Sequence, residues 1–180
     1  MSVPPASPGE PREPAAPAPP ASAAPAIGVR AEPLTSDAFR PFGAVIDLPR
    51  AAADASGHGW AWWARAASLP PDDRPLAIGY LVLEPAAARF DWAERHARSA
   101  EAILPLDGEC VVYVALPAPE PAGFRAFRVA AGSGVVLDPG VWHGAPLALD
   151  RPLCAIVLLP EGTGAEDTVV ARFQDQTIEV

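Results

Sequence analysis

From Leu76 to Phe173 the chain is a succession of short apolar or β-branched runs, each interrupted by turn-forming residues. The interruptions include Asp107–Gly108, Asp138–Pro139–Gly140 and several stretches rich in glycine and proline. No helical period longer than two turns appears between them. Seven or more short strands with regular turns are typical of an antiparallel sandwich or a small barrel. We therefore expect an all-β fold, a double-sheet β-barrel of the jelly-roll kind. The runs are LAIGYLVL, AILPL, CVVYVAL, FRAFRV, GVVL, PLCAIVLL and TVVARF.

The N-terminal segment differs in composition from the rest of the chain. Residues 1–26 hold nine of the 24 prolines and no aromatic residue. Such a segment buries little apolar surface, so we expect a disordered Pro/Ala-rich tail. Residues 27–180 are then one domain, which fits the length of 180 residues.

A short helix is expected near the start of this domain. The stretch LTSDAFRPFGAVI offers Thr35 or Ser36 as the N-cap, and Pro41 ends the helix. A strand should follow over Phe42–Ile46.

Charge and composition exclude several classes of partner. The formal charge is −9, all 13 basic residues are arginine, and none is lysine. Nucleic acid and anionic membrane surfaces are disfavoured, because both need a clustered positive face. A Schiff-base mechanism is excluded because it needs a lysine. No run reaches the ~18–20 apolar residues of a membrane helix, and no secretory signal is evident, so we expect a cytoplasmic protein.

Cys110 and Cys154 lie in apolar runs and are interpreted as buried thiols, with a single disulfide left open.

Polar residues of metal-ligand type gather in the stretch ERHARSAEAILPLDG. Glu94, His96 and Glu101 lie within eight residues, directly before an apolar run. They are either a solvated turn or ligands that point into a pocket.

The spacing in this stretch resembles a motif of the cupins, a family of small double-sheet barrels. The first cupin motif runs G-x5-H-x-H-x4-E-x6-G. Glu94 falls where its first histidine belongs, His96 on the second, Glu101 on the glutamate and Gly108 on the closing glycine. The second motif, G-x5-P-x-G-x2-H-x3-N, resembles GSGVVLDPGVWHGAPL, where His143 follows a glycine at the motif's spacing.

Strand geometry makes this resemblance physically reasonable. Residues i and i+2 of a strand face one side, so Glu94 and His96 should both point into the barrel. We expect a turn to bring Glu101 back on the neighbouring strand, and a later Pro-Gly turn to bring His143 in from the opposite side. Two imidazoles and two carboxylates suit a divalent ion such as nickel, manganese, iron or zinc. The alternative is a metal-free polar pocket.

A narrower resemblance covers about residues 30–160. The blocks PLTSDAFRPFGAVI, ERHARSAEAILPLDGECVVYVAL, FRAF and GVWHGAPLAL are similar, in matching order, to the ureidoglycolate lyase family. The resemblance implies a cupin-type barrel, usually a homodimer, that splits the small molecule ureidoglycolate into glyoxylate and urea in purine (allantoin) degradation. It also implies a divalent metal ion, nickel (Ni2+) in the usual assignment.

The family chemistry suggests roles for individual residues. Glu94, His96 and His143 would bind the metal, and Glu101 would be a fourth ligand or would transfer the proton. Catalysis is thus assigned to Glu101 and His143.

An arginine should bind the substrate carboxylate, because its planar fork matches that group. Arg65, Arg95 and Arg98 are candidates, and we assign substrate binding to Arg65 together with Trp63. Strand alternation predicts that Arg95 points away from the pocket. Trp142, next to His143, should likewise pack on the outer side.

Several positions depart from the family pattern. Glu101 stands where the family has glutamine, Ile103 where it has phenylalanine, and Gly144 where it has a second histidine after GVWH. Pocket residues have therefore changed while the scaffold motifs remain. The alternatives are another metal-dependent cupin enzyme acting on a small carboxylate, and a non-catalytic small-molecule-binding cupin. The clustered Trp60, Trp62 and Trp63 are interpreted as core or dimer packing, or as a pocket wall.

Overall fold

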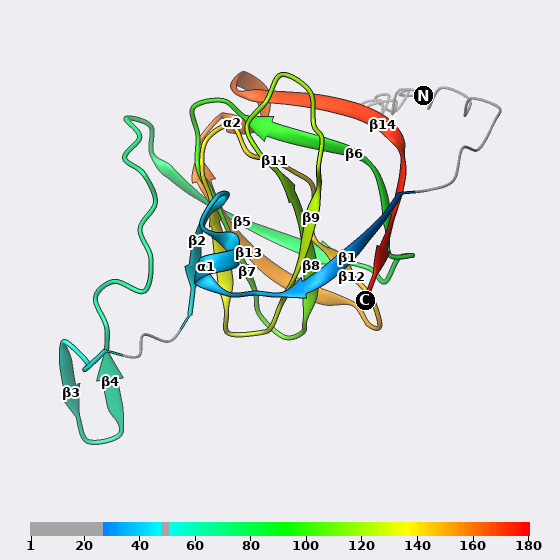
Figure 1. Cartoon of the computed structure of the whole chain (residues 1–180). Helices are drawn as coiled ribbons and strands as arrows, with labels where there is room; N and C mark the ends of the chain where they lie inside the picture. The colour runs from blue at the N-terminus through cyan, green and yellow to red at the C-terminus, as the bar shows by residue number, and fades with distance from the viewer. Residues whose placement is uncertain (1–26, 48–50) are drawn as a thin grey trace, which may run out of the picture.

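Two β-sheets form the barrel in the computed structural model, which describes residues 27–47 and 51–180 (Figure 1). The expected disordered tail, residues 1–26, lies outside the described residues. Strands dominate the described part, and its two helices are one turn long. The prediction of an all-β, cupin-like double-sheet barrel is confirmed.

The larger sheet has seven strands and curls into a ring. Strand β11 lies at one end of this sheet. It pairs with β6 and also with β8, so the sheet closes on itself. Closure removes most of the free strand edges. In spatial order the strands are β11 (Trp142–His143), β6 (Arg89–His96), β14 (Thr168–Glu179), β1 (Ile27–Pro33), β9 (Arg125–Val129), β8 (Cys110–Ala115) and β12 (Leu147–Ala148).

The smaller sheet has five antiparallel strands and open edges. Two runs noted in the sequence, LAIGYLVL and GVVL, coincide with whole strands of this sheet. In spatial order the strands are β2 (Gly43–Ile46), β10 (Gly134–Leu137), β7 (Glu101–Pro105), β13 (Leu153–Pro160) and β5 (Leu76–Leu83).

Two short helices join the strands. In α1 (Ser36–Phe39) the Thr35 hydroxyl accepts a hydrogen bond from the Ala38 amide at 3.2 Å, so Thr35, one of the two predicted residues, is the N-cap. The second helix, α2 (Thr163–Glu166), was not predicted from the sequence. Neither described helix is long enough to cross a membrane.

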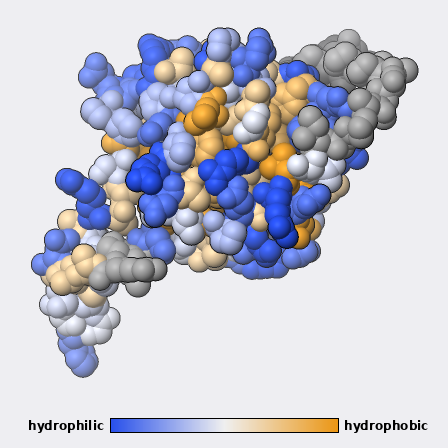
Figure 2. Space-filling view, viewed as in Figure 1, coloured by the Kyte–Doolittle hydropathy of each residue, from blue (hydrophilic) through white to orange (hydrophobic). Residues whose placement is uncertain are grey.

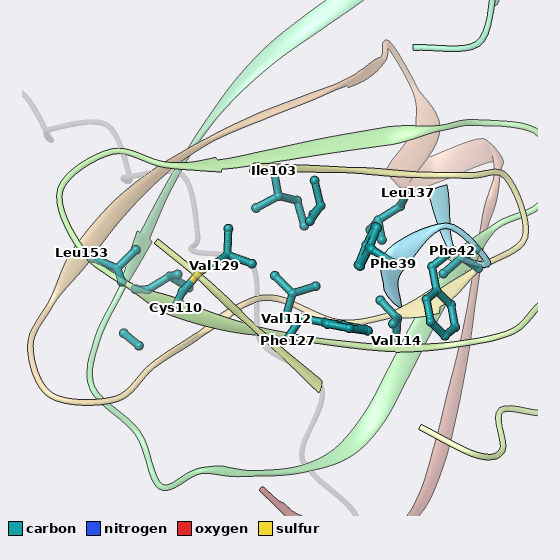
Figure 3. Close-up of a cluster of buried hydrophobic side chains, with 14 residues drawn as sticks. Phe39, Phe42, Ile103, Cys110, Val112, Val114, Phe127, Val129, Leu137 and Leu153 are labelled. Carbon is teal, nitrogen blue, oxygen red and sulfur yellow. The ribbon is translucent and has the colours of Figure 1, made fainter. Parts of the chain in front are cut away.

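The main hydrophobic core fills the space between the two sheets (Figure 3). Helix α1 contributes Phe39, whose ring centroid lies 5.2 Å from that of Phe127 on β9. Cys110 is a buried free thiol in this core, whereas Cys154 is a free thiol that is only half-buried. A second cluster, on the other face of the seven-stranded sheet, contains Trp142 and Tyr113. Strand β8 of that sheet therefore has two buried faces.

An arm of residues 51–75 leaves the barrel between β2 and β5 (Figures 1 and 2). Its strands β3 (Ala55–Gly57) and β4 (Trp60–Trp62) pair only with each other. Trp60 and Trp62 are more than half exposed. The interpretation of these two tryptophans as core residues is therefore wrong within one chain, while their packing in a dimer stays a prediction.

Candidate metal centre

His143 lies directly beside Glu94 in the seven-stranded sheet. The two residues are paired across β11 and β6, and the Gly140 amide donates to the carbonyl of His96 at 2.6 Å. Gly140 has φ +85°, a conformation that favours glycine, and so permits the tight turn before β11. Asp138 is exposed and simply begins this turn.

Glu101 reaches the centre from the opposing sheet, because β6 and β7 belong to different sheets. The prediction that Glu101 returns on the neighbouring strand is therefore wrong. The prediction that His143 comes from the opposite side is also wrong, since β11 is the neighbour of β6. The turn of residues 97–100 crosses from one sheet to the other. The spacing of the residues in the sequence does not show this crossing.

Asp167 holds this crossing turn in place. Its carboxylate accepts hydrogen bonds from the Arg98 amide, the Ser99 amide and the Ser99 hydroxyl, at 3.0, 2.9 and 2.6 Å. Burial alone would raise the pKa of Asp167, but the hydrogen bonds from Ser99 and Arg98 outweigh burial and lower it.

The four predicted ligand residues converge. One ligand atom each from Glu94, His96 and His143 lies within 4.8 Å of the others. Oε2 of Glu101 lies 3.0 Å from Nε2 of His96 and 3.5 Å from Nε2 of His143. Both histidines and Glu101 are buried, and Glu94 is half-buried. Three ligand groups thus come from one sheet, and a fourth carboxylate faces the two imidazoles from the other.

Hydrogen bonds fix the tautomer of both imidazoles. Nδ1 of His143 lies 3.0 Å from the Val141 carbonyl, which only accepts, so Nδ1 donates. The Thr168 hydroxyl donates to the Thr163 carbonyl at 3.0 Å, so it accepts from Nδ1 of His96 at 3.1 Å. In a neutral ring Nε2 then carries a lone pair. Both Nε2 lone pairs therefore point toward Glu101.

This arrangement needs a cation to be complete. Nε2 of His143 is buried without a hydrogen-bond partner, and Nε2 of His96 meets a carboxylate oxygen that is itself an acceptor when ionised. A shared proton or a bound metal ion would satisfy all three atoms. Two imidazoles and carboxylates form a donor set for a divalent ion, so the residues fit a metal.

The electrostatics of the centre favour an ionised Glu101. Burial alone would raise the pKa of Glu101, but the imidazoles of His143 and His96 beside it outweigh burial and hold it at about 2. Burial would lower the pKa of His143, but its interaction with Glu101 outweighs burial and raises it.

The centre is nearly closed within one chain. A cavity of about 390 Å³ is lined by residues such as Pro33 and Ser133, and another of about 160 Å³ by residues such as Leu69 and Arg74. Neither is lined by a candidate ligand. Glu94 is the most exposed of the four, and Val170, which lies opposite it on β14, is 56% exposed. Solvent therefore approaches the centre from the side of β14.

The residues predicted to bind substrate do not gather at this centre. Trp63 and Arg65 follow β4 on the arm, away from β6 and β11 (Figure 1). Arg98 is exposed and its nearest acid is Asp167. Arg95 does point away from the centre, as strand alternation predicts, with its guanidinium 5.0 Å from the ring of Trp142.

Trp142 likewise packs in the cluster on the other face of the seven-stranded sheet, as predicted.

Sequence reasoning missed one arginine on the correct face. Arg172 lies two residues after Val170 on β14, so both share the face of Glu94. The residues between and after them, Ala171 and Phe173, pack into the cluster on the other face. The run TVVARF contains Arg172, but only the register between β14 and β6 shows its proximity to Glu94.

Gly144, which stands where the family pattern has a second histidine, lies against the side chain of Tyr113. A Cβ atom at position 144 would lie 1.8 Å from the hydroxyl of Tyr113. This hydroxyl donates to the carbonyl of Trp92 at 3.0 Å. Tyr113 thus occupies the space that a larger residue at position 144 would need.

The fold and the centre together define a cupin-like double-sheet barrel with a candidate metal centre in its interior. The family model for ureidoglycolate lyase matches residues 26–180. The chain belongs to the ureidoglycolate lyase family.

Curated relatives agree with this assignment. The chain is 32% identical over 146 residues to the ureidoglycolate lyase of Pseudomonas syringae pv. tomato, which covers 74% of this chain and 83% of the relative. It is 33% identical over 160 residues to the ureidoglycolate lyase of Rhodobacter capsulatus, with 74% and 87% covered. Among solved structures, a 3,4-ketoisomerase from Helicobacter canadensis is similar over 52% of this chain and 66% of its own, with TM-score 0.43 and 12% identity.

Proposed function

We propose that this protein is a lyase that cleaves ureidoglycolate to glyoxylate and urea. The observation that carries the proposal is the convergence of Glu94, His96 and His143 in a member of the ureidoglycolate lyase family. The unpartnered Nε2 of His143 supports a bound cation at this point. We further propose that the cation is nickel, that the pathway is allantoin degradation, and that the enzyme works in the cytoplasm as a homodimer.

The chemistry requires one proton to move between two heteroatoms. Ureidoglycolate carries a hydroxyl, a carboxylate and a urea nitrogen on one carbon. In the reaction the O–H proton leaves, its electron pair forms the C=O of glyoxylate, and the C–N bond breaks. The departing urea nitrogen takes up one proton, so atoms and charge balance.

Glu94, His96 and His143 would hold the divalent ion, and Glu101 would transfer the proton. When bound, such an ion polarises the hydroxyl and carboxylate oxygens of the substrate. Glu101 carries an ionised carboxylate that faces both imidazoles. It accepts the hydroxyl proton and returns it to the urea nitrogen, as a general base and then a general acid.

Arg172 is the residue we propose for the substrate carboxylate. Its ion pair with Asp91 is 3.8 Å long, and both side chains are exposed, so the pair contributes little and is easily exchanged for a substrate. Diagonal neighbours on paired strands lie ~7–8 Å apart, within reach of a long side chain. Trp63 and Arg65 remain predicted substrate contacts, which substitution of each to alanine would test.

The test is glyoxylate release from ureidoglycolate by purified protein with metal analysis of the same sample. We expect turnover with about one divalent ion per chain, and neither turnover nor metal in His143→Ala. Arg172→Gln should raise KM by about 10- to 100-fold, the size of a lost charged hydrogen bond. Arg128→Gln, an exposed arginine paired with Glu109, is the matched control. A metal-loaded protein that releases no glyoxylate contradicts the proposed function.

A further inference from the structure

We propose that Arg74 is a positioning residue for the reaction. It holds the crossing turn of residues 97–100 and so sets where Glu101 lies relative to the two imidazoles. Arg74 lies at the end of the arm, two residues before β5. The role of Glu101 in proton transfer comes from the proposed function, on which this assignment rests.

The crossing turn determines how the two halves of the centre meet. It joins His96, the last residue of β6, to Glu101, the first residue of β7, and these strands belong to different sheets. Oε2 of Glu101 lies 3.0 Å from Nε2 of His96, so a small shift of the turn changes this contact. Misplacement of a reacting group by ~1 Å can slow a reaction by ~10²-fold.

Arg74 is the donor to the hydroxyl of Ser99, a buried residue of this turn. Ser99 gives its own proton to Asp167 at 2.6 Å, so its hydroxyl can only accept from other groups. The Thr163 hydroxyl lies 3.2 Å away, but its proton goes to the Pro160 carbonyl at 2.7 Å. Nη2 of Arg74 donates to the Ser99 hydroxyl at 2.6 Å. Asp167 and Arg74 therefore hold Ser99 from two sides.

Asp72 fixes the guanidinium of Arg74 in the orientation that reaches Ser99. Nε and Nη2 of Arg74 donate to the two carboxylate oxygens of Asp72, at 2.9 and 2.8 Å. The two side chains are 23% and 20% exposed. The planar fork of the guanidinium thus binds Asp72 and Ser99 together, a geometry that a lysine does not offer.

The guanidinium of Arg74 is unfavourable for the stability of the folded protein. Charged groups lose hydration when they are largely buried. Nη1 of Arg74 is also buried without a hydrogen-bond partner among the described residues, and an unpaired buried donor is destabilising. An apolar side chain of similar size would serve stability better. Departures of this kind are expected at functional positions, which favours a role for Arg74 at the turn.

The arm also packs against the residue that follows Ser99. Ala100 is buried in a small cluster, against which Ala67 and Leu69 of the arm pack. A cavity of about 160 Å³ lies beside this contact, lined in part by Leu69, Arg74 and Ala100. Packing between the arm and the turn is therefore incomplete, and the hydrogen bond from Arg74 fixes the turn where packing does not.

This arrangement predicts which step Arg74 affects. The other three candidate ligands and Arg172 all belong to the seven-stranded sheet, so they stay in place when the turn loosens. Glu101 begins a strand of the other sheet and depends on the turn for its position. Loss of Arg74 should therefore lower kcat and leave KM and metal content unchanged.

Steady-state kinetics of glyoxylate release and metal analysis of Arg74→Gln test this role. We expect kcat to fall by ~10–100-fold, with KM and metal content as in wild type. Asp72→Asn, which frees the guanidinium without removing it, should act in the same direction and serves if Arg74→Gln does not fold. An unchanged kcat, a raised KM or a lost metal ion each overturns the proposal.

Arg125→Gln is the matched control for a general loss of stability. Arg125 donates from two nitrogens to both carboxylate oxygens of Glu32, at 2.8 and 2.7 Å, on strands β9 and β1 away from the turn. This variant should keep the kcat of wild type even where urea denaturation shows that it is less stable. A kcat that falls as far as in Arg74→Gln would mean that lost stability explains both.

A double-mutant cycle tests whether Arg74 acts through Ser99. Ser99→Ala combined with Arg74→Gln should then lower kcat no further than Ser99→Ala alone, because residues that act as one unit are not additive. Two effects that multiply would show that Arg74 acts by another route and would overturn the proposal.

Amide hydrogen exchange tests the turn without any turnover. The amides of Arg98 and Ser99 donate to Asp167 at 3.0 and 2.9 Å, so they are protected. They should exchange faster in Arg74→Gln than in wild type or in Arg125→Gln, and equal exchange in all three proteins overturns the proposal. A wild type that releases no glyoxylate contradicts the proposed function instead, and exchange alone then decides whether Arg74 holds the turn.

Discussion

Thr168 is expected to control metal affinity without touching the metal. Its hydroxyl is the acceptor for Nδ1–H of His96, because its own proton is donated to the carbonyl of Thr163. Thr168→Val keeps the shape of the side chain and removes both hydrogen bonds. The buried Nδ1–H then loses its acceptor, or the proton moves to Nε2 and removes a ligand lone pair.

The burial of His96 sets the size of this effect. A buried donor left without a partner costs about 1–3 kcal/mol, and removal of a residue that orients a metal-bound histidine lowers affinity ~10–100-fold. The two ranges agree, since tenfold corresponds to about 1.4 kcal/mol. We therefore expect Thr168→Val to bind nickel ~10–100-fold more weakly than wild type.

A competition titration of metal-free protein against a chromophoric chelator measures this affinity directly. Thr168→Ser keeps the hydroxyl and should bind within a few-fold of wild type, which separates orientation of His96 from general damage. Urea denaturation of the metal-free variants checks that they are folded. The reasoning is refuted if Thr168→Val binds nickel as tightly as wild type, or if Thr168→Ser binds as weakly as Thr168→Val.

Three further predictions concern stability. Burial raises the pKa of Asp167, but hydrogen bonds from the turn of residues 97–100 outweigh burial and lower it below 3.8. The ionised carboxylate therefore adds to the free energy of unfolding above pH ~4, and this stabilisation is lost as the pH falls through the lowered pKa. Asp167→Asn should be less stable than wild type at pH 7, and its urea unfolding midpoint should change less than that of wild type between pH 6 and pH 2. An equal pH dependence of the midpoint in both proteins would contradict this. Gly144→Ala should lower the free energy of unfolding by about 1–3 kcal/mol, because the added methyl group clashes with the hydroxyl of Tyr113. Adding Tyr113→Phe to this variant should restore part of the loss, and an unchanged urea midpoint in Gly144→Ala would refute the clash. Removal of residues 1–26 should leave the melting temperature and turnover within error; a loss of several degrees would overturn the prediction.

The strands could be predicted because their signal is local. Runs such as Leu76–Leu83 and Gly134–Leu137 end at turn residues, and these strands begin and end where the runs do. The last strand was underestimated. The prediction ended it at Phe173, whereas β14 continues to Glu179, since only Gln176 and Ile178 of its polar second half are buried.

The convergence of the four candidate ligand residues could be predicted, but not the sheets from which they approach. Spacing alone put Glu94 and His96 on one face, which is a property of any strand. The side from which Glu101 and His143 approach depends on which sheet each strand joins, and that is decided by distant contacts. The hydrogen bonds of Asp167 to the crossing turn span 68 and 69 residues. The proximity of Arg172 to Glu94 depends in the same way on the register of β14 with β6.

The division of the centre between two sheets leads to a last prediction, on Glu101. Glu94, His96 and His143 all belong to the seven-stranded sheet and form the three-residue group without Glu101. Glu101→Gln should therefore retain about one nickel ion per chain. Turnover should fall ~10²–10⁴-fold if the carboxylate transfers the proton, because an amide has no basic oxygen at neutral pH. His96→Ala, the matched control from the other sheet, should lose both metal and turnover. Glutamine is also the residue at this position in the family pattern that the sequence resembles. Wild-type turnover in Glu101→Gln would mean that Glu101 only orients the two imidazoles, and that another group carries the proton.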